Sequence, residues 1–570
     1  MRSASRLAVA TLGLTLTLLA FLQNQSIVRD IVWPGLDIQY RELAGAQTIL
    51  DQGYGPDAAY AGERTWYNPM AIWLIAGLSR VSGESPARLI ARSGPYINLI
   101  APASLFVLVT VLFDQFAALA AVAAFIFAVG TGFPFIYSAT YSPWFAPENF
   151  AQAWLYLSIA CASVAFDSER SSFPAIAGGV LLGATFLTHA APALIGGVVW
   201  VMLAARESYR STSRGDVAGR LVLALGMAFI VSLPFTVQIL GHYHLAIVNR
   251  FPGLSPSDLL DLNELPALAR HLLGLPVALA IAALGFRAMR RRDRGTEVVL
   301  AFLAAVVLFL AAHVARLLVE RAGVRLPSIV PEYHFFFYFM AVVSIGAGVA
   351  LRDVGSAFAA WMRKPGADPS RLEAVGGLVT CGLTILVVAG SYSRYQQRVD
   401  FTDLRADIVA ANSRYPSDVV EWIRANSTPE DVFLSTDDAS LYIVSPAGRK
   451  VVATNRYFSN PYVDWAARDA DRRTMFDRLA QFDLSEFWAL AHKYGVGFVV
   501  VSADRSPEWL RASGMRSNDL PVIDSEALGN VPGFSLAFRS KRFDIVALST
   551  DDRPAVLRPP HEIVKSAVPK

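Results

Sequence analysis

The segment around which this 570-residue chain is organised reads Trp33-Pro-Gly-Leu-Asp-Ile-Gln-Tyr40, and it continues through Gly53-Tyr-Gly-Pro56 to Trp66-Tyr-Asn-Pro69. It lies between the first two strongly apolar stretches of the chain. An acidic residue, a predicted amphipathic helix over 38–51, a Gly-Tyr turn and an Asn-Pro step form one long loop over 23–95. A simple transporter has a short connection at this place. The loop therefore indicates chemistry at a membrane surface.

Apolar residues make up 54% of the chain. They cluster in blocks about twenty residues long, which is the length a helix needs to cross ~30 Å of hydrocarbon. We predict about eleven spans, at residues 7–22, 96–113, 116–137, 150–166, 174–187, 192–205, 221–240, 272–286, 297–319, 335–351 and 374–390. The expected fold class is a polytopic α-helical membrane protein, with a membrane domain over 1–390 and a soluble α/β domain over 391–570.

Arginine gathers in alternate loops of this predicted topology, with clusters at 206–220, 287–294 and 352–371. Because cationic residues are retained on the cytoplasmic face, the amino terminus is predicted inside and the loop 23–95 outside, with the soluble domain. The first apolar stretch lacks a small-residue cleavage pattern and is expected to remain as a span. We expect an integral protein of a bacterial inner (plasma) membrane. These arginines explain the net charge of +3, so no nucleic-acid partner is expected.

The polar region 391–570 alternates helix and strand patterns. A helix is predicted over 416–426, a strand at 432–435, and an amphipathic helix over 484–494 before the apolar strand 497–501. The segment 441–453 fits either two further strands or a short helix followed by a strand. Such alternation predicts a small α/β domain.

The layout resembles the GT-C superfamily of membrane glycosyltransferases, which take a sugar from a polyprenyl-phosphate carrier on the outer face of the membrane. The resemblance rests on the long loop, the next outer loop and the terminal domain, that is on Asp37, Tyr40, Gly53-Tyr54, Tyr67-Asn68-Pro69, the run from Arg80 to Arg92, Tyr141-Ser-Pro-Trp-Phe-Ala-Pro-Glu-Asn149 and 391–570. The amino-terminal half is most similar to the protein O-mannosyltransferase and lipid A aminoarabinose transferase branch.

The chain departs from that branch because Ile38 follows Asp37 where an Asp-Glu pair is usual. It also lacks the Trp-Trp-Asp-Tyr-Gly motif of oligosaccharyltransferases. The resemblance implies a hexosyl- or pentosyltransferase that uses a polyprenyl-phosphate sugar donor in the bilayer. The acceptor it implies is an extracytoplasmic glycan, lipid or protein.

Such a transfer needs a base for the acceptor hydroxyl and an electrostatic partner for the departing phosphate. Asp37 follows the Pro34-Gly35 turn at the start of a predicted helix, and we assign it as the general base. The alternative is that it caps this helix. Glu148 is the second catalytic carboxylate, which binds either the acceptor or a divalent ion. The alternative is that Glu148 is an acidic residue at the start of a helix, where the helix dipole stabilises its negative charge.

For the donor phosphate we predict a cationic surface at the outer end of the ninth span. His313, Arg316 and Glu320 fall on one helix face, Arg321 and Arg325 follow, and His334 lies before the tenth span. Ionisable groups at that depth usually face a protein cavity. The alternatives are that Arg316 snorkels or pairs with Glu320, and that His334 belongs to an interfacial aromatic belt.

Substrate contacts are expected from the outer loops, at Tyr40, Trp66, Tyr67, Asn68 and Glu332. Interfacial anchoring predicts the same aromatic residues. No metal ligands are assigned, since His242 and His244 fit a solvated loop. The sequence assigns no cofactor. A divalent cation at Glu148 remains an open alternative.

Two other classes of function remain as alternatives. A transporter or flippase of a lipid-linked glycan commonly carries paired charges at the bilayer midplane or shows repeat symmetry. The central thirds of these spans carry almost no charge and no internal repeat is evident. A catalytically inactive envelope scaffold is the third reading. No nucleotide-binding pattern is present, which disfavours a nucleotide sugar as the direct donor.

Overall fold

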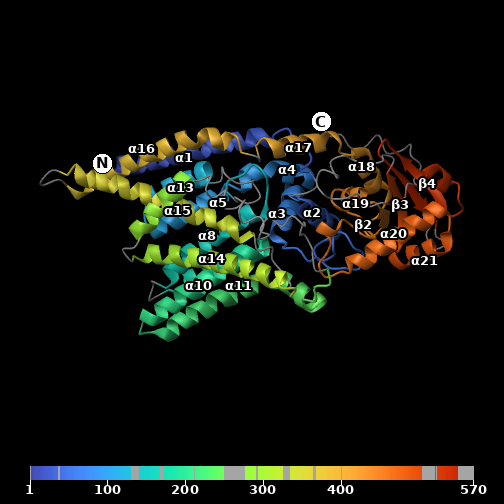
Figure 1. The fold of residues 1–570 in the computed structure, drawn as a ribbon, viewed down its shortest axis with the longest axis horizontal. Helices are drawn as coiled ribbons and strands as arrows, with labels where there is room; N and C mark the ends of the chain where they lie inside the picture. The colour runs from blue at the N-terminus through green and yellow to red at the C-terminus, as the bar shows by residue number, and fades with distance from the viewer. Residues whose placement is uncertain are drawn as a thin grey trace.

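The computed structural model describes residues 2–35, 39–129, 140–166, 171–210, 212–249, 276–289, 293–324, 334–363, 368–398, 401–502, 520–521 and 523–549. A helical bundle and a domain built on a sheet lie at opposite ends of the long axis, as Figure 1 shows. The helices of the first long loop lie between them. The predicted class, a polytopic helical protein with a terminal α/β domain, is confirmed.

The bundle and the first loop consist of helices with the following bounds: α1 (Arg2–Val28), α2 (Tyr40–Gln52), α3 (Met70–Ser82), α4 (Pro86–Ile97), α5 (Ile100–Leu112), α6 (Gln115–Ala123), the π-helix η1 (Ala124–Val129), α8 (Pro147–Ala165), α9 (Phe173–Thr188), α10 (Ala190–Arg210), α11 (Arg214–Tyr243), α13 (Pro276–Ala288), α14 (Arg294–Arg321), α15 (His334–Trp361) and α16 (Pro369–Gln396). Long helices α1 and α16 run side by side in Figure 1.

Among the residues that the structure describes, seven stretches of helix are long and apolar enough to cross a membrane: Ser5–Val28, Pro86–Leu112, Ala190–Arg210, Arg214–Tyr243, Arg294–Arg316, Phe337–Trp361 and Pro369–Gln396. Shorter apolar helices lie at Met70–Ser82, Gln115–Val129, Phe173–Thr188 and Leu279–Ala288. Each predicted span overlaps helix in the described residues, whereas residues 130–137 and 272–275 of two spans lie outside them. The number of crossings stays a prediction. The apolar helix Met70–Ser82 was not expected, because it is short and its Arg80 resembles a loop residue.

The terminal domain holds a five-stranded sheet in the order β2-β1-β3-β5-β4. Strand β1 pairs in parallel with β2 and β3, whereas β5 pairs antiparallel with β3 and β4. The strands are β1 (Val432–Ser435), β2 (Lys450–Val451), β3 (Val496–Ser502), β4 (Phe534–Arg539) and β5 (Phe543–Leu548). The helices are α17 (Asp403–Ser413), α18 (Ser417–Asn426), α19 (Asp437–Val444), the 3₁₀ turn η4 (Arg456–Phe458), α20 (Trp465–Gln481), α21 (Leu484–Tyr494) and α23 (Ser525–Gly529).

Helix α19 decides between the two interpretations of 441–453. Thr436 caps it by accepting a hydrogen bond from Ala439 N, so the chain enters a helix directly after β1. A short helix followed by the strand β2 is therefore the correct alternative, and residues 441–444 form no strand. The β-branched and aromatic residues of this segment gave a strand-like pattern because the helix is buried on all sides.

The first loop and the terminal domain are bonded through a buried carboxylate, Asp57, which is 2% exposed. Its side chain accepts hydrogen bonds from Ala59 N at 2.7 Å, Tyr60 N at 2.9 Å and Asn460 Nδ2 at 3.0 Å. Lys450 Nζ donates to the Asp57 carbonyl oxygen at 2.5 Å. Asp57 thus folds the loop and binds two residues of the terminal domain at once.

We expect Asp57→Ala to loosen the terminal domain from the loop. The change leaves three donors without their acceptor and Lys450 without a nearby negative charge, so the cost is about 3 kcal/mol. Limited proteolysis and thermal unfolding in detergent measure it, as faster cleavage near residue 400 and a lower Tm. Asp30→Ala is the control, because Asp30 pairs with Arg29 in an exposed ion pair. Equal protease resistance of the two variants would contradict the role given to Asp57.

Candidate functional site

Three ionisable side chains meet where helices of the bundle begin or end. Glu148 lies in the first turn of α8, His189 lies between α9 and α10, and His334 is the first residue of α15. One ligand atom from each lies within 4.8 Å of the other two. His189 Nε2 is 3.6 Å from Glu148 Oε1, and the two imidazole centroids are 4.7 Å apart. We call these three residues the Glu-His-His cluster.

The local structure around Glu148 fixes its position. Pro147 occupies the first helical position of α8, where it needs no hydrogen bond, so Glu148 falls in the first turn. The preceding loop is held by Asn98, whose Nδ2 donates to the carbonyl oxygens of Ser142 and Trp144 at 2.8 Å each. Gln39, at the start of α2, donates to the Phe145 carbonyl oxygen. The first loop therefore helps to position this carboxylate.

His189 is held by its backbone. It ends α9 in an extended conformation, and its N–H donates to the Thr185 carbonyl oxygen at 2.8 Å. Ala191 N lies 3.3 Å from Nδ1, so Nε2 faces Glu148. A carboxylate and two imidazoles are a donor set that suits zinc or another first-row divalent cation, with a coordination position left for substrate. The cluster fits such an ion.

Helix α2 places two more charged residues beside the cluster. Glu42 is 2% exposed and accepts a hydrogen bond from the Tyr67 hydroxyl. Burial raises the pKa of Glu42 to about 7, the charge of Glu148 adds to the rise, and Arg41 opposes it. The Arg41 guanidinium lies 5.4 Å from the ring centroids of both Trp66 and Tyr67.

The terminal domain contributes to the same region. Phe458, in the turn η4, lies 5.8 Å from the Arg41 guanidinium. The Tyr40 hydroxyl is 3.4 Å from Thr454 Oγ1, and Tyr40 is buried. The aromatic residues Tyr40, Trp66 and Tyr67 are thus brought together around α2, as the prediction of a substrate surface requires. Their role in binding stays a prediction.

The described residues that were predicted to bind the donor phosphate lie on two different helices. His334 joins Glu148 in the Glu-His-His cluster, whereas His313 and Arg316 lie along α14 and Arg321 is its exposed last residue. Asp37, Arg325 and Glu332 lie outside the described residues.

Sequence reasoning missed His189, Arg41 and Glu42. Signals were present for two of them. His189 is an imidazole in a short connection between the predicted spans 174–187 and 192–205, and Glu42 interrupts the apolar face of an amphipathic helix. Arg41 gave no such signal, because a surface arginine in a loop helix is common.

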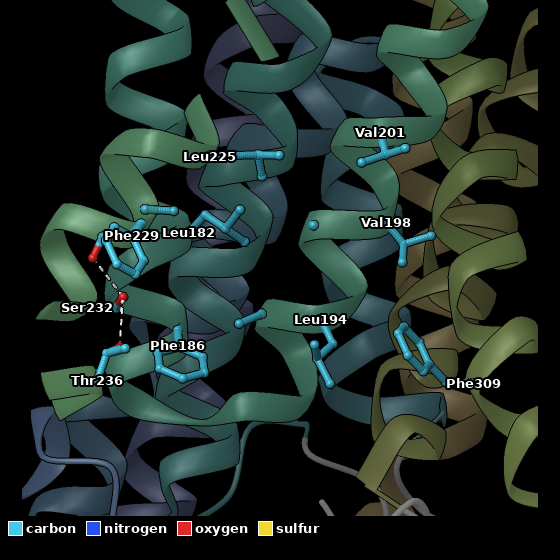
Figure 2. Close-up of a pocket in the computed structure, with 13 residues that line it drawn as sticks. Leu182, Phe186, Leu194, Val198, Val201, Leu225, Phe229, Ser232, Thr236 and Phe309 are labelled. Atoms are coloured by element: carbon cyan, nitrogen blue, oxygen red, sulfur yellow. Dashed lines mark hydrogen bonds between the residues drawn. The ribbon is translucent and has the colours of Figure 1, made fainter. Parts of the chain in front are cut away.

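An apolar groove of about 600 Å³ runs between α9, α10 and α11, with Phe309 of α14 at its side. Figure 2 shows its lining, which is Leu182, Phe186, Ala193, Leu194, Gly197, Val198, Val201, Leu225, Ala228, Phe229, Ser232, Thr236 and Phe309. The two hydroxyls in this lining satisfy each other and the backbone, since Thr236 donates to Ser232 Oγ at 3.2 Å and Ser232 donates to the Phe229 carbonyl at 2.8 Å. The groove therefore offers an apolar surface to a ligand.

One end of the groove leads to the polar region. Asn68 Nδ2 donates to the carbonyl oxygen of Phe186, a groove residue, at 2.6 Å. His189 follows Phe186 by one helical turn at the end of α9. The apolar groove and the Glu-His-His cluster are consequently joined through a single short segment of α9 and through the first loop.

No protein-family model matches the chain, and no curated protein matches its sequence. Its fold is similar to that of ArnT from Cupriavidus metallidurans, solved in the apo state, with a TM-score of 0.55 at 14% identity over 94% of this chain and 97% of that one. ArnT bound to undecaprenyl phosphate gives the same TM-score at 13% identity and the same coverage. Arabinofuranosyltransferase AftD from Mycobacteria gives 0.54 at 13% identity over 97% of this chain and 40% of AftD. These neighbours are GT-C glycosyltransferases, so the resemblance is confirmed for the fold.

Proposed function

We propose that this protein is a membrane glycosyltransferase that moves a sugar from a polyprenyl-phosphate donor to an extracytoplasmic glycan, lipid or protein. One observation carries the proposal: an apolar groove at the bundle surface ends next to the Glu-His-His cluster, whose three side chains are ionisable. A polyprenyl-phosphate sugar has the same two parts, a long apolar chain and a polar head. A transporter needs a polar path across the membrane, which an apolar groove does not supply.

The proposed reaction exchanges one bond at the sugar for another. Asp37 takes the proton of an acceptor hydroxyl, and the acceptor oxygen bonds to the anomeric carbon. The bond from that carbon to the phosphate oxygen breaks, and its electron pair leaves with the polyprenyl phosphate. In-line attack inverts the anomeric carbon. His313, Arg316 and Arg321 of α14 remain our candidates for the phosphate, together with Arg325, which lies outside the described residues.

Glu148, His189 and His334 would hold a divalent cation at this site. When bound, such an ion supplies positive charge against the departing phosphate, which otherwise gains negative charge as the bond breaks. Arg41, whose guanidinium lies over two aromatic rings, adds a further positive charge at this site. Tyr40, Trp66, Tyr67, Asn68 and Glu332 are our candidates for substrate contact.

The proposed location is the outer face of a bacterial inner membrane. The arginine clusters of the sequence place the loop 23–95 outside. The same topology puts Glu148, His189 and His334 at outer ends of their predicted spans, and the three side chains do meet. One span more or fewer between the first loop and α8 would separate Glu148 from that loop by the membrane.

Mass spectrometry of envelope glycans and polyprenyl-phosphate sugars tests the proposal in cells that lack the protein, complemented with wild type or Asp37→Asn. We expect one glycan to lose one sugar and its lipid-linked donor to accumulate. Wild type should restore both, and Asp37→Asn neither. Restoration by Asp37→Asn would remove the assignment of the base. An unchanged glycan profile would favour a transporter or a scaffold instead.

A further inference from the structure

We propose that Glu42 binds a hydroxyl group of the donor's sugar and so helps to decide which sugar is transferred. The inference rests on the proposed function, since it assumes a lipid-linked sugar at the end of the groove. Neither the sequence patterns nor the reaction described above assigns a role to Glu42.

Glu42 has one carboxyl oxygen engaged and one available. The Tyr67 hydroxyl donates to the carboxyl group, yet Oε2 is buried and meets no hydrogen-bond donor among the residues that the structure describes. The side chain is 2% exposed, so bulk water does not compensate. Burying an acceptor without a donor costs free energy, so such a group calls for a partner, which can be a ligand, an ion or an ordered water.

The charges around Glu42 restrict the kind of ligand. Arg41, Glu148 and Tyr67 are the charged and titratable neighbours that act on it. A phosphate would meet two carboxyl groups and one guanidinium, so it is disfavoured at Oε2. An apolar group would leave Oε2 unsatisfied. A neutral hydroxyl donates a hydrogen bond without adding charge, and hydroxyls are the groups that distinguish one sugar from another.

The position of Glu42 points to the donor's sugar rather than to the acceptor. Its partner Tyr67 precedes Asn68, whose amide is bonded to the carbonyl of Phe186 at the end of the groove. A polyprenyl chain in the groove would therefore place its first polar groups beside Tyr67 and Glu42. A carboxyl group accepts a hydroxyl hydrogen whether it is neutral or ionised.

Two probes separate sugar from lipid recognition in the full-length protein: undecaprenyl phosphate, and the lipid-linked sugar purified from the deletion cells in which it accumulates. We expect Glu42→Gln to weaken binding of the sugar-bearing lipid about 10- to 100-fold, because Gln turns its amide N–H toward the hydroxyl while its oxygen keeps Tyr67. Its Kd for undecaprenyl phosphate should change less than about 2-fold. Tyr67→Phe removes the hydrogen bond from Tyr67 to the Glu42 carboxyl group. It should weaken binding of the sugar-bearing lipid by a smaller factor than Glu42→Gln does.

Glu63→Gln is the matched control, because Glu63 lies in the same loop but faces His242 and Arg468. It should leave both affinities unchanged, and an unaltered Tm confirms that each variant folds. Equal weakening of both lipids by Glu42→Gln, or no weakening, would overturn the inference while the proposed function stands. If wild type binds neither lipid, the proposed function itself fails, and the role of Glu42 with it.

Discussion

Glu148→Gln is expected to lower sugar transfer about 10²- to 10³-fold and to weaken binding of Zn²⁺ or Mn²⁺ to the purified protein. A glutamine keeps the shape of the side chain but removes the only carboxylate of the Glu-His-His cluster, so a divalent cation loses its charged ligand. Isothermal titration with each metal after chelation, together with the metal content of the purified protein, measures the loss independently of turnover.

His244→Ala is the control for this experiment. His244 is an exposed imidazole after α11, whose Nδ1 lies 3.0 Å from the Leu240 carbonyl oxygen. It should bind metal and turn over like wild type. Wild type that binds no divalent cation would contradict the assignment of the cluster. Loss of turnover in Glu148→Gln with metal affinity intact would instead assign Glu148 to the acceptor.

Gly197→Phe should reduce binding of undecaprenyl phosphate about 10²-fold. Gly197 lines the groove on α10, and a Cβ atom built there meets nothing within 4 Å, so a side chain can extend from this position into the groove. The phenyl ring would displace about one isoprene unit of the lipid. Each buried methylene contributes about 0.8 kcal/mol, so the loss of a few of them accounts for the expected change in Kd.

Gly226→Phe is the matched control for the groove. Gly226 also has nothing within 4 Å of its Cβ position, but it does not line the groove. Both variants replace a helical glycine at an open surface, so their effects on folding should be similar and small. Equal lipid affinity of the two proteins would show that the lipid binds elsewhere on the bundle.

Much of the architecture follows from the sequence for simple physical reasons. Apolar blocks of membrane-crossing length form helices because the bilayer leaves the backbone no other hydrogen-bond partners. Helix 484–494 and the strand after it were predicted because amphipathic spacing and a glycine stop are local signals. Local signals left 441–444 undecided between helix and strand, because a fully buried helix has no polar face to reveal its period.

The candidate site likewise combines features that the sequence predicts with features that depend on tertiary packing. Hydropathy was enough to predict that Glu148 and His334 lie at ends of helices, and their placement on the outer side stays a prediction. Only the tertiary structure brings them to His189 and sets Glu42 beside them, because this convergence depends on how distant helices pack. The groove, too, exists only between packed helices. Sequence spacing describes one element at a time, whereas a site is made of side chains from several elements, whose distances are fixed by the packing of the whole bundle.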